Sequence, residues 1–389
     1  MKTIAVIFGG RSTEHDVSIV TALASIIKPL ELTKKYKVEA VYIAKDGSWY
    51  WDEKLKDISL YQSGEIEDFM HKAPKVHILF DNGLTLVKSS QFAGRKQYKN
   101  IDVVFPAMHG THGEDGELMG VLDMANVPYV GCNVPSSAVA MDKVLSKQVT
   151  GSAGVPSTPW MWFYSRDLGR DHSKIIKSIE KLEYPLFVKP AHLGSSIGIT
   201  KVDNPDQLTN ALEVAAHYDD KVIVEQAVNN LVEVTLPIIG NEDPVPALLE
   251  QPLLHSEDFF DFETKYMSGG KKGGGKKMGG KQGAQGYSKI PADLPKDLYD
   301  EAVDLGLKVY KTVGCSGIAR IDMLVDTKTK MVTFNEINPL PGSLYAHNWQ
   351  QNGVSSVDLV TRLVDFAEDR WKKQQKLATA FSTNFLKQF

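Results

Sequence analysis

Residues 317–338 read GIARIDMLVDTKTKMVTFNEIN, and this stretch predicts an antiparallel hairpin with a polar turn near residues 326–330. Alternation along a strand places every second side chain on the same face. In the first strand, Ile318–Val325, one face holds Ile318, Arg320, Asp322 and Leu324. In the second strand, Met331–Asn338, one face holds Val332, Phe334, Glu336 and Asn338. Antiparallel pairing then brings Arg320 close to Glu336.

The predicted patch combines a cation, two carboxylates and an amide with apolar neighbours. Oxygen ligands of this type suit Mg²⁺, which proteins bind through a few carboxylates together with substrate phosphates. The alternative is a solvated sheet face with one salt bridge, although Leu324, Val332 and Phe334 on the same face argue against it. Alternation alone leaves both interpretations open.

A second candidate segment lies upstream, where His192–Gly198 (HLGSSIG) separates the predicted strands Tyr184–Lys189 and Ile199–Val202. Backbone N–H groups of such a turn can cradle a phosphate, and Lys189 would add a positive charge. The segment is not a Walker A sequence, because no Gly-Lys-Ser/Thr opens a helix. An ordinary hairpin turn is the alternative.

Two polar segments follow predicted strands in the first third of the chain. GGRSTEHD (residues 9–16) follows Thr3–Phe8, and PAMHGTHGEDG (residues 106–116) follows Ile101–Phe105. Ligands of α/β sheets bind at the carboxyl ends of the strands, so both segments are candidates, with plain polar loops as the alternative. The HxxH spacing has no fixed helical register, which disfavours zinc.

Strand patterns alternate with helix patterns along the chain, which predicts an α/β and α+β fold. We expect domains at residues 1–131, 132–229 and 230–389. Further strands are predicted at Val38–Tyr42, Pro128–Val130, Lys221–Gln226, Glu233–Ile239 and Pro246–Glu250. Helices are predicted at Val17–Leu30, Gly116–Asn126, Pro135–Gly154, residues 204–218, Asp297–Val313 and Ser356–Lys373. The tail, residues 374–389, has no clear assignment.

Composition restricts the function. The 389 residues carry a net charge of −4, which disfavours a dedicated nucleic-acid binder. Two cysteines cannot form a disulfide framework, and no apolar run approaches the ~20 residues that a membrane span needs. A cytoplasmic protein without a membrane partner is therefore expected. Residues 269–286, GGKKGGGKKMGGKQGAQG, cannot form a core and indicate either a linker or a lid.

Taken together, the motifs resemble those of the D-alanine–D-alanine ligase family of ATP-grasp enzymes. The motifs that carry this resemblance occur in family order: GGRSTEHDVS (9–18), HGTHGEDG (109–116), MDK (141–143), FVKPAHLGSSIG (187–198), FFDFETKY (259–266), GIARIDML (317–324) and NEINPLPG (335–342). The resemblance implies a three-domain ATP-grasp architecture with an N-terminal parallel-sheet domain. It also implies that residues 267–287 form a mobile lid.

The implied reaction joins two D-alanines for peptidoglycan precursor synthesis. ATP would phosphorylate the carboxylate of the first D-alanine, and the amine of the second would attack the acyl phosphate. By match to the family, the nucleotide site comprises Lys143, Lys189, Ser195, Ser196, Glu225, Gln226, Val228, Glu233 and Lys265. The implied ligands of two Mg²⁺ ions, or of Mn²⁺, are Asp322, Glu336 and Asn338.

The resemblance also assigns the substrate residues. Glu14 would anchor the first ammonium and join Ser195 and Tyr266 in a hydrogen-bond chain that closes the lid. His109 would bind the first carboxylate. Arg320 and the Gly342 N–H would stabilise the oxyanion.

One departure from the family concerns the second substrate. Its carboxylate is usually bound by a serine-leucine pair about five residues beyond the final glycine, and His347 and Asn348 stand there in this chain. D-Lactate, D-serine or another amino acid therefore remains an alternative acceptor, and a catalytically inactive nucleotide-binding protein is a third interpretation. Gln226 also replaces a lysine that is common on the adenine strand. A homodimer formed through the first domain is a further expectation from the resemblance.

Overall fold

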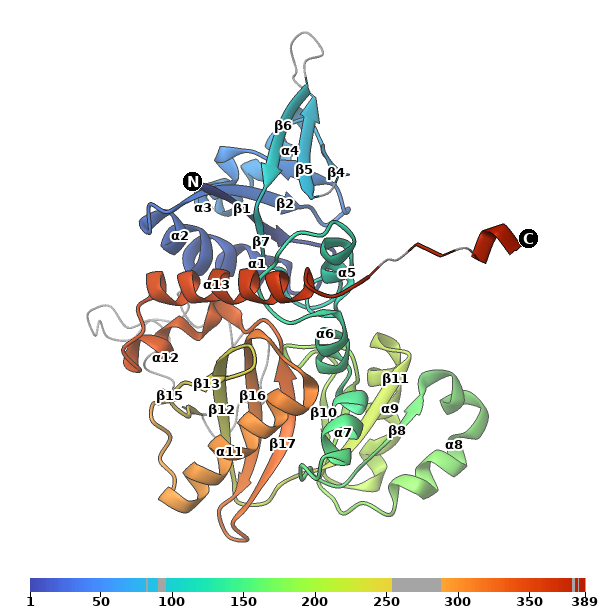
Figure 1. The fold of residues 1–389 in the computed structure, drawn as a ribbon. Helices are drawn as coiled ribbons and strands as arrows, with labels where there is room; N and C mark the ends of the chain where they lie inside the picture. The colour runs from blue at the N-terminus through green and yellow to red at the C-terminus, as the bar shows by residue number, and fades with distance from the viewer. Residues whose placement is uncertain (82, 90–95, 254–287, 380–381, 384, 389) are drawn as a thin grey trace.

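The structure is a computed structural model of the chain, and it describes residues 1–389 except 82, 90–95, 254–287, 380–381, 384 and 389. Three four-stranded sheets organise these residues, one in each of the three ranges expected from the sequence (Figure 1). The predicted lid, Lys265 and Tyr266 lie outside the described residues. No described helix is long and apolar enough to cross a membrane.

The first sheet is mainly parallel and has the strand order β3-β2-β1-β7. Its strands are β1 (Lys2–Gly9), β2 (Tyr36–Ile43), β3 (Trp49–Trp51) and β7 (Val103–Pro106). The predicted amphipathic stretch Val17–Leu30 is helical, and it divides into α1 (His15–Val20), a π-helical segment (Thr21–Ile27) and α2 (Lys28–Leu32). Its apolar side chains join the core of this sheet.

The predicted strand Ile101–Phe105 is wrong as a single element. β6 (Lys96–Ile101) belongs to a separate antiparallel sheet with β4 (Val76–Phe80) and β5 (Leu84–Ser89), and β7 begins only at Val103. Asp102 separates β6 from β7, and its carboxylate accepts a hydrogen bond from the Thr3 N–H at 2.7 Å. The short helices α3 (Ile58–Gln62) and α4 (Glu65–Lys72) precede β4, and α5 (Glu117–Met124) follows β7. The predicted strand Pro128–Val130 is only an isolated bridge between Tyr129 and Val104.

The central sheet is antiparallel and has the order β10-β9-β11-β8. Its strands are β8 (Trp160–Tyr164), β9 (Leu186–Pro190), β10 (Thr200–Val202) and β11 (Lys221–Gln226). Helices α8 (Ser165–Ile179) and α9 (Leu208–Tyr218) pack against it. The predicted strands at residues 184–189, 199–202 and 221–226 are confirmed to within two residues.

The predicted helix Pro135–Gly154 is two helices, α6 (Val134–Met141) and α7 (Lys143–Ser152). Asp142 divides them because its extended backbone lets its carboxylate cap α7, accepting hydrogen bonds from the N–H groups of Val144 (2.9 Å) and Leu145 (3.0 Å). Lys143 therefore opens a helix at the edge of the central sheet, and its N–H donates to Ala191 O at 3.0 Å.

The third sheet has the order β13-β12-β16-β17. Its strands are β12 (Leu231–Gly240), β13 (Val245–Pro246), β16 (Gly317–Asp326) and β17 (Met331–Asn338), and α11 (Lys296–Val313) packs on it. The predicted strand Pro246–Glu250 is wrong beyond Pro246. Residues 247–250 lead instead to β14 (Gln251–Pro252), which pairs with β15 (Ser288–Lys289).

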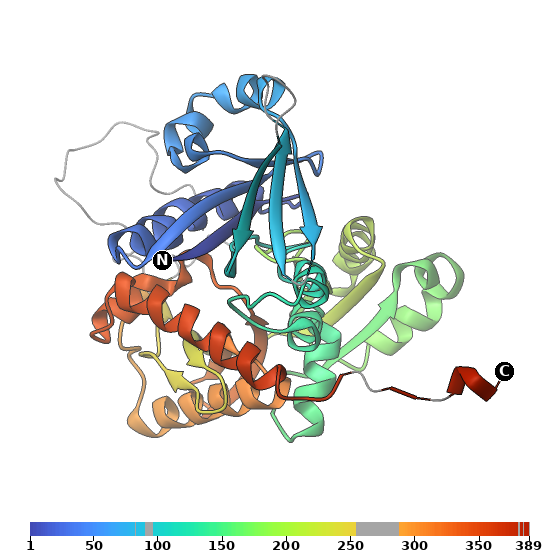
Figure 2. The same cartoon turned by 45° about the horizontal axis from the view of Figure 1, so that its top comes forward.

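The C-terminal part of the chain returns to the first domain. After a 3₁₀ turn (Gly342–Tyr345) and α12 (Ala346–Gln351), the long helix α13 (Ser356–Gln374) lies along the first domain (Figure 2). Its apolar side chains Leu359, Val360, Leu363, Val364 and Ala367 share one core with β1 and β2. Beyond α13 the chain extends away from the body and ends in a 3₁₀ turn, Phe385–Gln388 (Figure 1).

Candidate active site

The hairpin β16–β17 places the predicted metal ligands side by side. Arg320 pairs with Asn338, and Asp322 pairs with Glu336. The register then shifts between Asp322 and Met323, so that Met323 pairs with Phe334. The predicted face is therefore partly wrong, because this bulge turns Phe334 and Val332 into the core beneath the sheet. The polar face keeps Arg320, Asp322, Glu336 and Asn338.

Asp322 links the polar residues of this face. Its carboxylate accepts from Arg320 Nε at 2.7 Å and from Asn338 Nδ2 at 3.1 Å, and it also bonds the terminal Arg320 nitrogen. Burial alone would lower the pKa of Arg320, but the charge of Asp322 outweighs burial and raises that pKa well above its ordinary value. The guanidinium is therefore a permanent, oriented cation.

The two predicted phosphate lysines face the hairpin from different elements. Lys143, at the start of α7, lies 3.5 Å from Glu336 Oε2 and donates to Leu193 O at 2.6 Å. Lys189, on β9, donates to Glu225 Oε2 at 2.6 Å. Leu193 belongs to the predicted phosphate turn, so Lys143 connects this turn with the hairpin.

Glu225 also forms an ion pair with Lys147, a residue that the sequence analysis did not predict. Lys147 Nζ lies 3.1 Å from Glu225 Oε1, and its side chain is 1% exposed. Burial raises the pKa of Glu225, but the two ammonium groups outweigh burial and lower it to about 2. Burial lowers the pKa of Lys147. Burial also acts to lower the pKa of Lys189, but Glu225 outweighs burial there and the pKa of Lys189 is raised. Lys147 follows Lys143 by four residues on α7, and this spacing is the only signal that could have indicated it.

The serine turn meets the first domain at Glu14. Ser195 and Ser196 adopt left-handed backbone conformations, with φ of 53° and 59°. The Ser195 hydroxyl donates to the Glu14 carboxylate, which is the predicted pair. Gly110 and Gly194 flank Glu14 closely: an added Cβ would lie 2.9 Å and 3.0 Å from Glu14 Oε2. Glycine at both positions therefore lets two loops close around one buried carboxylate.

His109 connects to the glycine turn through Thr21, a residue that sequence reasoning missed. The Thr21 hydroxyl is 2.9 Å from His109 Nε2 and accepts from the Ser343 N–H at 3.1 Å. Burial lowers the pKa of His109, but the hydrogen bond and charge of Glu114 outweigh burial and raise it. The first domain thus reaches the turn that begins at Gly342.

The turn after Gly342 is strained. Ser343, Leu344 and Tyr345 all have positive φ, at 51°, 54° and 50°. The left-handed region costs a non-glycine residue about 1–2 kcal/mol, and such strain clusters at functional sites. The turn places the Tyr345 ring 5.2 Å from the Arg320 guanidinium carbon.

His347 and Asn348 contact a buried carboxylate, Glu250. His347 Nε2 lies 3.1 Å and 3.0 Å from the two oxygens of Glu250, and Asn348 Nδ2 donates to one of them at 3.0 Å. The charge of His347 and its hydrogen bond outweigh the burial of Glu250, whose pKa is lowered. Sequence reasoning missed Glu250, because it lies in no recognised motif.

The remaining predicted nucleotide residues lie around β11 and β12. Gln226 ends β11, and its Oε1 accepts from the Glu183 N–H at 3.2 Å. Val228 follows two residues later and is half-buried. Glu233 lies on β12 opposite Leu324, and its charge acts on Lys189. Glu233 therefore lies close enough to Lys189 to interact with it electrostatically.

His192 connects the serine turn with the start of α7, and its contacts predict how the stability of the fold depends on pH. Its Nδ1 lies 2.9 Å from Asp219 Oδ1, its Nε2 lies 3.4 Å from Asp142 Oδ2, and these carboxylates raise its pKa to about 9. A raised pKa stabilises the fold fully below the unfolded value of about 6.5, and the contribution is lost as pH rises through about 9. Urea unfolding should show wild type more stable than His192→Gln at pH 6, with the difference shrinking by pH 10. A difference that stays constant between these pH values would contradict this assignment.

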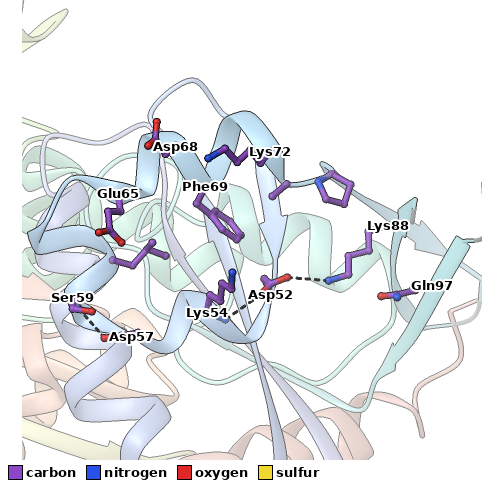
Figure 3. Close-up of a pocket in the computed structure, with 13 residues that line it drawn as sticks. Asp52, Lys54, Asp57, Ser59, Glu65, Asp68, Phe69, Lys72, Lys88 and Gln97 are labelled. Atoms are coloured by element: carbon purple, nitrogen blue, oxygen red, sulfur yellow. Dashed lines mark hydrogen bonds and ion pairs between the residues drawn. The ribbon is translucent and has the colours of Figure 1, made fainter. Parts of the chain in front are cut away.

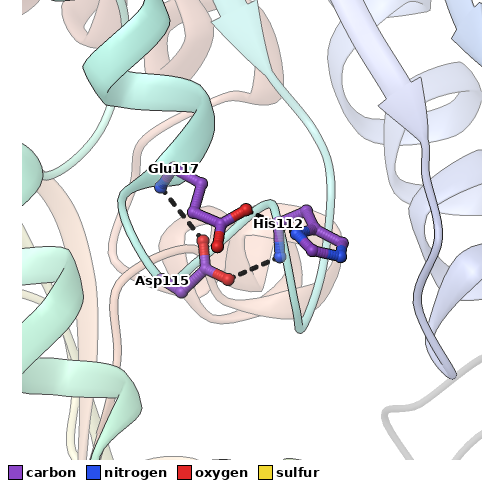
Figure 4. A group of neighbouring side chains, drawn as sticks. All are labelled: His112, Asp115 and Glu117. Carbon is purple, nitrogen blue, oxygen red and sulfur yellow. Dashed lines mark hydrogen bonds and ion pairs between the residues drawn. The ribbon is translucent and has the colours of Figure 1, made fainter. Parts of the chain in front are cut away.

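Two other polar features lie apart from this constellation. His112 contacts Glu117 Oε2 through Nδ1 and Asp115 through its backbone N–H, both at 2.5 Å, so the three residues satisfy one another (Figure 4). A pocket of about 920 Å³ opens beside α3, α4 and β5 and contains Asp52, Phe69 and Lys88 (Figure 3). Neither feature includes a residue to which the family resemblance assigns a role.

The chain matches known proteins over most of its length. Residues 3–132 match the family model for the D-ala D-ala ligase N-terminus, and residues 149–365 match that for the C-terminus. A D-alanine–D-alanine ligase of Acetivibrio thermocellus is 37% identical, with 96% of this chain and 98% of the relative covered.

Two solved structures extend the comparison. The D-alanine-D-alanine ligase from Coxiella burnetii matches with a TM-score of 0.78 at 30% identity, covering 96% of both chains. The VanG D-Ala:D-Ser ligase from Enterococcus faecalis matches with a TM-score of 0.74 at 30% identity, covering 94% of this chain and 99% of that one. The predicted ATP-grasp architecture is confirmed. The chain belongs to the D-alanine–D-alanine ligase family.

Proposed function

We propose that this protein is an ATP-dependent ligase that joins two D-alanines for peptidoglycan precursor synthesis. The observation that carries the proposal is a set of contacts that joins the three sheets: Ser195 donates to Glu14, Lys143 contacts both Leu193 and Glu336, and Thr21 accepts from the Ser343 N–H. An inactive nucleotide binder would have no use for an oriented arginine beside carboxylates and a glycine turn. D-Serine remains the second candidate acceptor, since one structural relative is named as a D-Ala:D-Ser ligase.

The reaction has two steps. A carboxylate oxygen of the first D-alanine attacks the γ-phosphorus of ATP, and ADP leaves. The amine nitrogen of the second D-alanine then attacks the carbonyl carbon of the acyl phosphate and forms a C–N bond. The C–O bond to phosphate breaks, phosphate leaves with the electron pair of that bond, and the amine gives up a proton. Both steps place negative charge where cations and N–H donors can stabilise it.

Different residues are proposed to bind the first substrate and to stabilise the oxyanion. Glu14 holds the first ammonium, and Ser195 fixes the Glu14 carboxylate. His109, kept in place by Thr21, binds the first carboxylate. Arg320 and the Gly342 N–H face the oxyanion, a role worth about 2.7–4 kcal/mol per donor in well-studied enzymes.

Lys143, Lys189 and the turn at Ser195 and Ser196 are proposed to bind the phosphates. Glu225, Gln226, Val228 and Glu233 are proposed to surround the adenosine. Lys265 and Tyr266 keep their proposed roles at the phosphoryl group and the lid.

The residues present fit divalent metal ions. Asp322, Glu336 and Asn338 offer hard oxygen donors on adjacent strands, and Asn338 uses its Nδ2 toward Asp322, which leaves Oδ1 for a cation. Two Mg²⁺ ions, or Mn²⁺, would neutralise the charge of the transferring phosphoryl group. We also propose the domain limits 1–131, 132–229 and 230–389, and a homodimer.

The direct test measures ADP, phosphate and product with D-alanine, D-serine and D-lactate as acceptors. D-alanyl-D-alanine should be the main product. A protein that consumes ATP with none of the three acceptors would contradict the proposal.

Glu14→Gln tests the first-substrate site. Loss of a charged hydrogen bond, worth about 1.5–3 kcal/mol, should raise the KM for the first D-alanine about tenfold or more. The KM for ATP should change less, because glutamine keeps an acceptor oxygen for the Ser195 hydroxyl of the proposed phosphate turn. Steady-state kinetics will show this, with Glu31→Gln on α2 as the matched surface control. Equal increases in both KM values would argue against the ammonium role.

A further inference from the structure

The segment between β13 and β14 brings a carboxylate to the position expected for the second substrate. Glu250 is 5% exposed. Its backbone is fixed to β12 by two hydrogen bonds with Thr235, at 2.8 Å and 2.9 Å. Its side chain therefore projects from a rigid sheet edge rather than from a free loop.

Asn348 has no donor left for a substrate. Its Nδ2 donates to Leu248 O at 2.9 Å and to Glu250 Oε2 at 3.0 Å, which uses both hydrogens. Its side chain is fully buried, and among the described residues its Oδ1 has no hydrogen-bond partner. Asn348 thus supports Glu250 from below.

Among the described residues, only one ring nitrogen of His347 makes a hydrogen bond. Its Nε2 is engaged by Glu250, its side chain is 23% exposed, and in the described part of the chain Nδ1 makes no hydrogen bond. The Tyr345 ring centre lies 5.1 Å from that of His347 and 5.2 Å from the Arg320 guanidinium carbon. The Tyr345 ring is therefore a neighbour of both His347 and the proposed oxyanion group.

We propose that Glu250 is a positioning residue that orients His347 so that Nδ1–H donates to the carboxylate of the second substrate. The His347 ring then lies between two carboxylates, one from the protein and one from the acceptor, with one ring nitrogen facing each. Asn348 supports Glu250 and does not contact the acceptor. This inference rests on the proposed ligase function, and it makes the acceptor a small molecule with a free carboxylate.

The test separates the two steps of the reaction. Hydroxylamine attacks the acyl phosphate in place of the second D-alanine, so that D-alanyl hydroxamate reports the first step without the acceptor site. In Glu250→Ala, hydroxamate formation should stay within about twofold of wild type, and the KM for the second D-alanine should rise about tenfold or more. Glu242→Ala, which removes an exposed carboxylate paired with Lys373, is the matched control.

Two further variants distinguish orientation from loss of folding. Glu250→Gln keeps the volume and one acceptor oxygen, and should lie between wild type and Glu250→Ala. The double variant Glu250→Ala/His347→Ala should have the same acceptor KM as His347→Ala alone, because Glu250 acts through His347.

The outcomes separate this inference from the proposed function. Unchanged acceptor KM, or equal losses of hydroxamate and dipeptide, would overturn the role of Glu250 while leaving the ligase intact. Additive effects in the double variant would also overturn it. Wild-type protein that forms no ATP-dependent hydroxamate would overturn the proposed function, and the inference with it.

Discussion

Replacing Glu336 by glutamine will lower kcat to below about a hundredth of wild type while the midpoint of thermal unfolding stays nearly unchanged. Glu336 pairs with Asp322 across the hairpin, and its Oε2 lies 3.5 Å from Lys143 Nζ. An amide removes one negative charge from the metal site, and two-metal sites need that charge to hold both ions. Its side chain is 28% exposed, so the fold depends on it little.

The measurement is steady-state turnover at saturating ATP and D-alanine over a range of Mg²⁺ concentrations, together with thermal unfolding. Glu213→Gln on the surface of α9 is the matched control. More than about a tenth of wild-type kcat at saturating Mg²⁺, a loss of less than ~1.4 kcal/mol, would contradict the metal assignment.

The hairpin β16–β17 shows how far alternation in the sequence predicts which side chains share a face of a sheet. Alternation has a period of two, so it correctly places Arg320 and Asp322 together on the first strand. It fails on the second strand, because Phe334-Asn335-Glu336 alternates without any mark of the bulge that turns Phe334 inward. A bulge depends on the partner strand and on the core below, which no local pattern contains.

Contacts between domains were predictable only from the family motifs. Glu14 and Ser195 are 181 positions apart, and nothing in either local sequence indicates the other. Thr21 and Glu250 lie outside the motifs and were missed, although each contacts a predicted site residue. Lys147 was also missed: helix spacing would put it on the face of Lys143, but periodicity assigns a lysine to solvent and not to a buried ion pair.

Glu225→Gln will lower the free energy of unfolding by about 3–5 kcal/mol, because it leaves two buried ammonium groups without their counter-charge. Lys147 and Lys189 contact opposite oxygens of Glu225, at 3.1 Å and 2.6 Å. The KM for ATP should also rise, because Lys189 loses the partner that orients it. Urea unfolding at pH 7 measures the first effect and ATP titration measures the second.

The double variant Glu225→Gln/Lys147→Met decides whether the buried charge is the cause. Removing Lys147 with Glu225 takes away one of the two uncompensated charges, so this double variant should be more stable than Glu225→Gln alone. A pH series gives an independent check. Because the pKa of Glu225 is lowered from 4.5 to about 2, its contribution is complete above pH 4.5 and is lost as pH falls through about 2. The stability difference between wild type and Glu225→Gln should therefore narrow across that interval; a difference that persists at pH 2 would show that packing around Glu225, and not its charge, holds the two lysines.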